Sequence, residues 1–396
     1  MSDSYQTALS QIIRVLKTSP GAPTVENLLR LASIYKFETF QEPIENNLSR
    51  ISIAGQILVI DIDFEEIPTQ AKGQTRFHLH SVKLILANNE ASFKEVSSIT
   101  GESVLRNALT LNPDLGKFDL SLERLSTIDQ HSVVEHGELK IDCFEFISNV
   151  EKLLLSKFGK DNVVINAHHE FCFVVLEKFK IYLVSDESMS TALYLMKNGE
   201  LERSGTLDDV GFHCEFLHDR ALPVVKQPSE SLIQILNESA IDLPTVDDTF
   251  KTKKHGDITH TIQIFPLFRN ELVLSTGLQC GDIKHLVETI DTISKLEQIV
   301  RVVDLVKEKC TVVDKFAEME FETAKLNEFL EKSHGGSASG GDNMDIDRKY
   351  IALTVSDDEL VVEGTLSDIC GTLSLSDPEF VTRVSELASS LEMNVL

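Results

Sequence analysis

Two apolar runs within residues 48–87 constrain the fold of this chain more than any other feature. In the first run, residues 57–64, apolar side chains alternate so that one face of a strand is wholly apolar, while Asp61 and Asp63 make the other face polar. The second run, residues 82–87, alternates in the same way, and the segment between the runs contains a proline and a glycine, which favour turns. The sequence therefore predicts an antiparallel β-hairpin over residues 57–87 whose apolar face is covered by helices.

Helical spacing is the main pattern on both sides of this hairpin. Apolar residues recur every three or four positions in residues 4–17, 24–35, 40–48, 92–111, 114–128 and 141–158. Thr24 stands where a helix N-cap is expected, after a segment interrupted by Pro20, Gly21 and Pro23. Residues 1–160 are therefore expected to form a helix-rich unit around the hairpin.

The periodicity changes after residue 161. Short runs rich in β-branched and aromatic residues indicate strands at residues 163–165, 171–176, 180–184, 192–196, 211–217, 261–265 and 271–276, with one helix at 230–238. From Ile283 to Val303 apolar residues again step by three or four, which predicts a long helix. A Gly- and Ser-rich linker, two short strands and a final helix at 378–391 complete the pattern.

The fold class that these patterns predict is α+β. A helix-rich N-terminal unit around a β-hairpin is followed by a mainly antiparallel β-sheet unit with long helices. The expected boundaries are 1–160 for the helix-rich unit, 161–281 for the sheet unit, 282–331 for a long helical segment, 332–348 for the linker and 349–396 for the C-terminal strand pair and helix.

The charge balance restricts the class of partner. The 396-residue chain has 63 Asp and Glu residues against 37 Lys and Arg residues, a formal net charge of -26. A surface of this sign repels phosphate backbones, so direct sequence-specific binding of nucleic acid is disfavoured. Basic partners, or neighbours in an assembly, fit better.

Cysteine usage and hydropathy predict a soluble intracellular protein. The 6 cysteines are scattered singly with no Cys-x-x-Cys pair, a usage typical of compartments in which thiols stay reduced. No apolar run approaches the ~20 residues that a membrane helix needs. The first residues are polar and lack the charged and apolar regions of a signal peptide.

The sharpest candidate for a metal site lies on the hairpin. Asp61 and Asp63 are two residues apart and share a strand face, and His78 and His80 do the same on or just before the partner strand. Two carboxylates and two imidazoles form a ligand set suited to a divalent ion. These residues also lie where the strands leave the core, where polar side chains are expected anyway, so we interpret them as structural or solvated.

Other candidates for a chemical site are weaker. His168, His169 and Glu170 are adjacent and would point in opposite directions on a strand, and His213, Cys214 and His218 lack a second ligand pair. Gly-x-Ser-x-Gly, Gly-x-x-x-x-Gly-Lys and Gly-x-Gly-x-x-Gly motifs are absent from the sequence. The basic run 251–254 is too short to define an import signal. We therefore assign no catalytic, cofactor-binding or metal-binding residue, and no enzymatic activity or cofactor is predicted.

The same region of the chain carries a family resemblance. The run Leu-Ser-Arg-Ile-Ser-Ile-Ala-Gly-Gln-Ile-Leu-Val-Ile-Asp-Ile-Asp at residues 48–63 resembles the corresponding segment of the Mediator subunit 1 family, fungal branch. Residues 24–31, 82–87 and 112–115 flank it in the order and spacing of that family, over about the first third of the chain. Beyond residue 137 the resemblance fades to general pattern.

The resemblance implies a function without catalysis or cofactor. It implies a structural subunit in the middle module of the nuclear Mediator complex, which relays signals from DNA-bound activators to RNA polymerase II by packing against other subunits. Animal members of the family dock on nuclear receptors through Leu-x-x-Leu-Leu boxes, which this chain lacks; residues 232–236 and 326–330 are only degenerate versions.

Two alternatives remain open from the residues themselves. One is an intracellular metal-dependent enzyme that uses Asp61, Asp63, His78 and His80, and the other is an acidic chaperone for basic proteins. If the chain is a subunit, we expect its partner surfaces on the helix that begins at Ile283 and on the hairpin edge.

Overall fold

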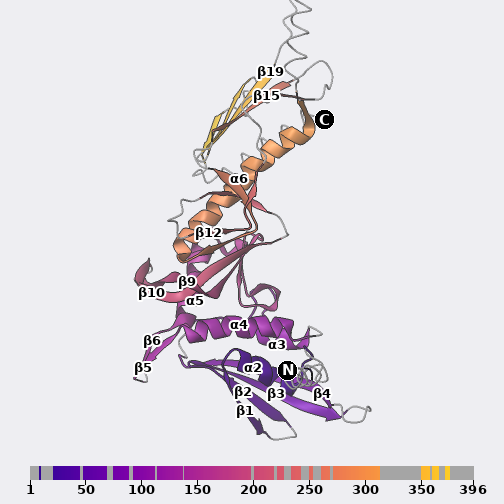
Figure 1. The fold of residues 1–396 in the computed structure, drawn as a ribbon, viewed down its shortest axis with the longest axis vertical. Coiled ribbons are helices and arrows are strands. Elements are labelled where there is room, and N and C mark those ends of the chain that lie inside the picture. Colours follow the sequence, from indigo (N-terminus) through magenta and orange to yellow (C-terminus); the bar gives the residue numbers. More distant parts are fainter. Residues whose placement is uncertain are drawn as a thin grey trace, which may run out of the picture. The chain divides into compact units, whose positions relative to one another are not determined.

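The structure, a computed structural model, is shown in Figure 1. It describes residues 9, 21–44, 48–68, 75–88, 92–111, 114–136, 138–197, 200–217, 221–226, 233–241, 249–252, 260–267, 271–312, 349–356, 359–364 and 371–374. The chain divides into two compact units: unit 1 comprises Met1–Arg220, Leu232–Leu236 and Gly277–Val287, and unit 2 comprises Ala221–Ser231, Asn237–Thr276 and Glu288–Leu396.

Unit 1 contains a four-stranded antiparallel sheet, here called the N-terminal sheet. Helix α2 (Val25–Ile34) precedes β1 (Glu38–Pro43), β2 (Ser49–Ala54), β3 (Leu58–Pro68) and β4 (Thr75–Leu86), and the strands lie in the order β1-β2-β3-β4. Alternation along the strands gives this sheet a buried apolar face that includes Ile51, Ile53, Ile60, Ile62 and Phe64, each 0% exposed. Strands β3 and β4 pair as the hairpin predicted over residues 57–87.

Three helices follow the N-terminal sheet. They are α3 (Val104–Thr110), α4 (Gly116–Gln130) and α5 (Cys143–Phe158), and the small hairpin of β5 (Val133–Glu135) and β6 (Glu138–Ile141) separates the last two. Asp142 starts α5, because its side chain accepts hydrogen bonds from the backbone N–H groups of Phe144 and Glu145. In Figure 1, α4 lies between the N-terminal sheet and the strands that follow α5.

A second, six-stranded antiparallel sheet completes unit 1. Its order is β12-β17-β10-β9-β8-β7. The strands are β7 (Val163–Ile165), β8 (Phe173–Val175), β9 (Phe179–Lys197), β10 (Glu200–Phe216), β12 (Ile233–Leu236) and β17 (Gly277–Cys280), and the short 3-10 helices η1 (Lys160–Asn162) and η2 (Ala167–His169) precede β7 and β8. The hairpin of β9 and β10 forms the centre of this sheet.

The described part of unit 2 consists mainly of strands. Its three-stranded sheet has the order β11-β16-β13, formed by β11 (Leu222–Val225), β13 (Ser239–Ala240) and β16 (Leu272–Ser275). Its six-stranded sheet has the order β18-β14-β15-β19-β20-β21, formed by β14 (Thr249–Thr252), β15 (His260–Leu267), β18 (Cys310–Val312), β19 (Lys349–Ser356), β20 (Glu359–Gly364) and β21 (Gly371–Ser374). The pair β15 and β19 is parallel, whereas the other pairs of this sheet are antiparallel.

Helix α6 (Ile283–Lys309) is the last helix that the structure describes. Asp282 caps it, because the Asp282 carboxylate accepts hydrogen bonds from the backbone N–H groups of Lys284 and His285. Of the helical segment predicted over residues 282–331, the structure describes residues 282–312: α6 ends at Lys309, and the chain then enters β18. Among the described helices, none has both the length and the hydropathy that a membrane span requires.

The predicted fold class is wrong. The described residues form mostly strands in antiparallel sheets, so the N-terminal region is not a helix-rich unit and the sheet region is not dominated by long helices. Residues 40–48 were expected to be helical, but β1 occupies residues 38–43. This strand is exposed along nearly its whole length, so it lacks the apolar alternation that marks a half-buried strand.

Two further helices were predicted wrongly. The helix expected over residues 92–111 begins only at Val104, after the Ser103 N-cap, and the residues before it form turns and one isolated bridge. The helix expected over residues 230–238 is strand β12 where it is described, paired with β17. A short apolar run such as Ile233–Leu236 fits either a helix or a strand, and tertiary pairing decides between them.

Other predicted elements lie outside the described residues. These are most of the helix at 4–17, the linker at 332–348 and the final helix at 378–391. The expected domain boundaries stay a prediction.

The turn between β2 and β3 is held by a buried carboxylate. Asp129, at the end of α4, is 2% exposed and accepts hydrogen bonds from the backbone N–H groups of Gln56 at 2.8 Å and Ile57 at 2.9 Å. Gly55 lies so close that a Cβ at this position would collide with the carboxylate of Asp129. The turn therefore docks on α4 only with glycine at position 55.

Replacing Gly55 tests this contact. We expect Gly55→Ala to lower the free energy of unfolding by roughly 2 kcal/mol, because the carboxylate must move and leave buried N–H groups unpaired. Urea denaturation followed by circular dichroism measures the change. The matched control is Gly205→Ala in β10, where the nearest atom to a new Cβ is Leu193 Cδ1 at 3.9 Å. Equal stability of the two variants would contradict the role given to Asp129.

Candidate functional site

The two aspartates predicted as metal ligands are bound to other side chains of the N-terminal sheet. Arg50 Nε lies 2.7 Å from Asp63 Oδ1, and Arg50 Nη1 lies 3.7 Å from Asp61 Oδ2. Ser52 Oγ donates a hydrogen bond to Asp61 at 2.6 Å, and Ser81 Oγ donates one to Asp63 at 2.8 Å. The hydrogen bond from the Arg50 guanidinium holds the pKa of Asp63 below its ordinary value. Arg50 therefore supplies the positive charge that the metal hypothesis assigned to an ion.

The two histidines of that hypothesis lie in β4, before the residues that pair with Asp61 and Asp63. The His78 and His80 rings contact each other edge to face with centroids 5.0 Å apart, and His80 Nε2 lies 3.7 Å from Glu65 Oε2. A register shift between Asp63 and Phe64 separates this part of the hairpin from the part that carries the aspartates. In the described parts of the chain, no group of three or more His, Cys, Asp or Glu side chains is placed to hold a metal ion. The structure does not support the metal-dependent enzyme.

The His168, His169 and Glu170 segment is a turn and not a strand. Both histidines have positive φ, 56° and 61°, within or next to η2. Glu170 is 2% exposed, and its carboxylate pairs with Lys117 of α4 and, at 2.6 Å, with Lys180 of β9. Although burial raises the pKa of Glu170, the two ammonium groups hold it below its ordinary value. Glu170 is thus a buried charge that joins a helix to a sheet.

The third predicted group also has a packing role. The ring of His213 stacks on Tyr182 with centroids 5.0 Å apart, and Cys214 is fully buried beside it in β10. Burial lowers the pKa of His213 and raises that of the Cys214 thiol, so both side chains favour their neutral forms. His218 lies outside the described residues.

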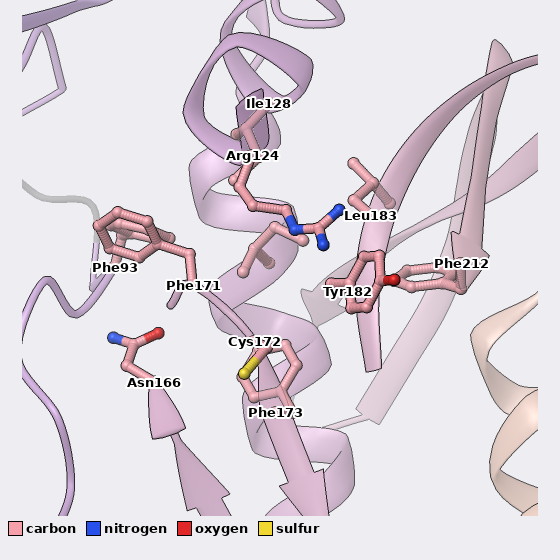
Figure 2. A pocket seen from close by; sticks show the side chains of 11 residues that line it. Phe93, Arg124, Ile128, Asn166, Phe171, Cys172, Phe173, Tyr182, Leu183 and Phe212 are labelled. Atoms are coloured by element: carbon pink, nitrogen blue, oxygen red, sulfur yellow. The ribbon is translucent and has the colours of Figure 1, made fainter. Parts of the chain in front are cut away.

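Sequence reasoning missed the contact between Arg124 and Tyr182. Arg124, in α4, is 7% exposed, and its guanidinium carbon lies 3.3 Å from the centre of the Tyr182 ring in β9 (Figure 2). The signal was present, because Arg124 lies between Leu122 and Leu125, two buried apolar residues of the helix that was predicted over residues 114–128. An arginine that stays inside such a face needs an aromatic or acidic partner.

A small cavity adjoins this contact. Arg124, Asn166, Phe171, Cys172 and Tyr182 are among the residues around it, as Figure 2 shows, and its volume is about 30 Å³. That space suits one or two water molecules and not a substrate. The larger hollows of unit 1 are open grooves: one of about 460 Å³ is lined by Tyr35, Lys36, Glu38, Gly55 and Gln130, among others. Another, of about 530 Å³, is lined by Leu139, Glu145, Phe146, Leu193 and Leu195, among others.

The described polar clusters of unit 1 thus hold elements together, and the larger hollows are open to its surface. Residues 10–200, which contain the N-terminal sheet, α4 and β9, match the family model described as "Mediator of RNA polymerase II transcription subunit 1". This part of the chain is therefore similar to a family of transcription regulatory subunits. That family is Mediator subunit 1, and the resemblance noted in the sequence is confirmed as a resemblance.

The chain is also similar to yeast proteins named "Mediator of RNA polymerase II transcription subunit 1". The protein of Saccharomyces cerevisiae is 38% identical over 138 residues, which are 34% of this chain and 23% of that protein. The protein of Eremothecium gossypii is 31% identical over 196 residues, 48% of this chain and 42% of that protein. The protein of Kluyveromyces lactis is 33% identical over 158 residues, 39% of this chain and 35% of that protein. The matches therefore span less than half the length of each of these relatives.

The charge of Glu170 gives the stability of unit 1 a defined pH dependence. Because the folded-state pKa of Glu170 lies below the ordinary value of 4.5, its ion pairs stabilise the fold above that pH and are lost as the pH falls through the folded-state pKa. We expect Glu170→Gln to cost roughly 3 kcal/mol at neutral pH, since it leaves two lysines without their buried partner. The difference from the wild-type chain should shrink on acidification to about pH 3.5.

Denaturant titrations of both chains at the two pH values measure this difference. Asp186→Asn in β9 is the matched control. The Asp186 carboxylate is close to solvent, and its hydrogen bond from the Ser188 hydroxyl is exposed, so its removal should change the free energy of unfolding little. A penalty for Glu170→Gln that stays constant with pH would contradict the assignment of charge to Glu170.

Proposed function

We propose that this chain is a non-catalytic structural subunit of the Mediator coactivator complex. The observation that carries the proposal is the match of residues 10–200 to the Mediator subunit 1 family, together with the yeast relatives of that name. In this role the chain acts in the nucleus by packing against other subunits. It contributes to the relay of signals from DNA-bound activators to RNA polymerase II without binding DNA itself.

The net charge and the polar clusters of the chain support a structural role. A net charge of -26 favours basic neighbours in an assembly and disfavours direct contact with DNA. The polar clusters that a sequence search would pick as reactive, around Asp63 and Glu170, are neutralised by Arg50, Lys117 and Lys180. We further propose a place in the middle module, which rests on the resemblance of residues 48–63 and their flanking segments.

Affinity purification from the native cell tests the proposal. The tagged full chain, captured at moderate salt, should bring along the other Mediator subunits and RNA polymerase II in amounts that mass spectrometry can compare. The matched control is the tagged Gly55→Ala chain adjusted to equal abundance, which should recover less of the complex if the family region makes the contacts. Recovery of the chain as a lone monomer would overturn the proposal.

The charge also favours a second candidate, an acidic chaperone for basic proteins. A chaperone of this type would bind free histones tightly when isolated, and the affinity would fall steeply with salt. We expect instead weak and unselective histone binding by the purified chain, measured by fluorescence anisotropy over a salt series. Tight stoichiometric binding would favour the chaperone over the structural subunit.

A further inference from the structure

The register of β1 on β2 determines which backbone N–H and C=O groups of β1 point away from the N-terminal sheet. Among the described residues β1 pairs only with β2, and it forms an edge of the N-terminal sheet (Figure 1). The N–H of Ile44 donates to the C=O of Leu48 at 2.8 Å, and directly hydrogen-bonded pairs alternate along an antiparallel ladder. Counting back by twos from Ile44, Phe40 is bonded to β2, whereas Thr39 and Gln41 direct their N–H and C=O groups away from it.

The hydrogen bonds between β2 and β3 confirm which residues of β2 bond to β1. The N–H of Gly55 donates to the C=O of Leu58 at 2.9 Å, so the bonds from β2 to β3 use the alternate residues of β2. Residues 50, 52 and 54 are therefore left to bond β1, through residues 42, 40 and 38. Pro43, which has no N–H, is one of the residues that point away from β2, so its missing donor breaks no hydrogen bond between β1 and β2.

The side chains beside this edge form an acidic, apolar, acidic row. Glu38, Phe40 and Glu42 share the face of the sheet that carries Ser52, and Phe40 is 58% exposed. Glu38 lies opposite Ala54, and Glu42 lies opposite Arg50, whose guanidinium is bound to Asp63 at 2.7 Å. A strand added along β1 would place its own side chains of this face directly beside the row.

The groove of about 460 Å³ continues from the start of this edge. Glu38 lines it together with Tyr35 and Lys36, which precede β1, and with Gly55 of the β2–β3 turn. Lys36 has a positive φ of 64°, which turns the chain sharply from α2 into β1. A segment that runs along β1 past Glu38 therefore has space to continue.

We propose that the open edge of β1 binds an extended segment of a partner protein that carries a basic, an apolar and a basic residue at alternate positions. Thr39 and Gln41 supply the backbone hydrogen bonds, Phe40 packs on the apolar residue, and Glu38 and Glu42 attract the basic residues. The inference rests on the proposed function in one respect, because it gives the chemistry of a neighbouring subunit.

A second copy of this chain fits the edge poorly. Antiparallel pairing of two β1 strands about Phe40 would place Glu38 of each copy beside Glu42 of the other, and parallel pairing would place like residues together. Like charges directly opposite each other destabilise a strand pair. The occupant must therefore carry the opposite charge.

A short peptide with the central sequence Lys-Thr-Phe-Thr-Lys is the probe. We expect the purified full chain to bind the fluorescein-labelled peptide with a Kd of about 10–100 µM, measured by anisotropy at low salt. A peptide in which glutamates replace both lysines should bind at least about tenfold more weakly.

A proline at position 41 separates edge pairing from other contacts. Gln41→Pro removes an outward N–H without breaking a bond to β2, so the sheet stays folded and the peptide affinity should fall about tenfold or more. Gln41→Thr, which keeps the N–H, is the matched control and should stay within about twofold of the wild-type affinity. Unfolding curves of both variants check that the sheet is intact.

Reversing the charges of β1 should create binding to the glutamate peptide, a result that partial unfolding of the variant cannot produce. The double variant Glu38→Lys, Glu42→Lys should prefer the glutamate peptide over the lysine peptide. Failure of the wild-type chain to bind, as when another segment of the chain occupies the edge, overturns the inference, and so does equal binding by Gln41→Pro. The inference is also overturned if the wild-type chain sediments as a dimer and the Gln41→Pro chain sediments as a monomer, because the edge would then bind a second copy.

These results are separable from the test of the proposed function. If the tagged wild-type chain recovers Mediator but the purified chain does not bind the peptide, the function stands and the inference falls. If the peptide binds with the expected variants but Mediator is not recovered, the inference stands and the function falls.

Discussion

Buried polar contacts of α4 are the constraint on which unit 1 depends. At 100° per residue, Lys117 and Arg124 return to within ~20° of the same face, and they contact Glu170 and Tyr182 on the side of the second sheet. Asp129 lies ~140° further round and binds the turn between β2 and β3. Apolar packing alone would allow the helix to rotate or slide, whereas these directional contacts allow one setting.

The parts of the fold that burial controls were the parts that the sequence could predict. Strands β3 and β4 alternate apolar and polar residues because one face of the sheet is buried, and α2 starts where Thr24 accepts a hydrogen bond from the N–H of Asn27. β1 carries no such pattern, since its residues are mostly exposed and its conformation comes from pairing with β2. The helix-rich description of the N-terminal region failed on this point.

The candidate site followed the same logic. Residue types and spacing singled out Asp61, Asp63 and Glu170 as candidates, but they did not reveal the cations beside them, because Arg50, Lys117 and Lys180 come from other elements of the fold. All of these contacts fall within residues 10–200, the range that matches the family model. The family match therefore covers the whole arrangement around α4, from Gly55 to Tyr182.

The position of Pro43 has a consequence for how far a docked chain can extend. A regular edge strand offers an unbroken series of donors and acceptors, and such a series can seed open-ended stacking of chains. In β1 the series stops at a residue with no amide hydrogen, two positions after Gln41. Pairing along this edge is therefore limited to a short stretch of polypeptide, and the missing amide hydrogen opposes the growth of a fibril from it.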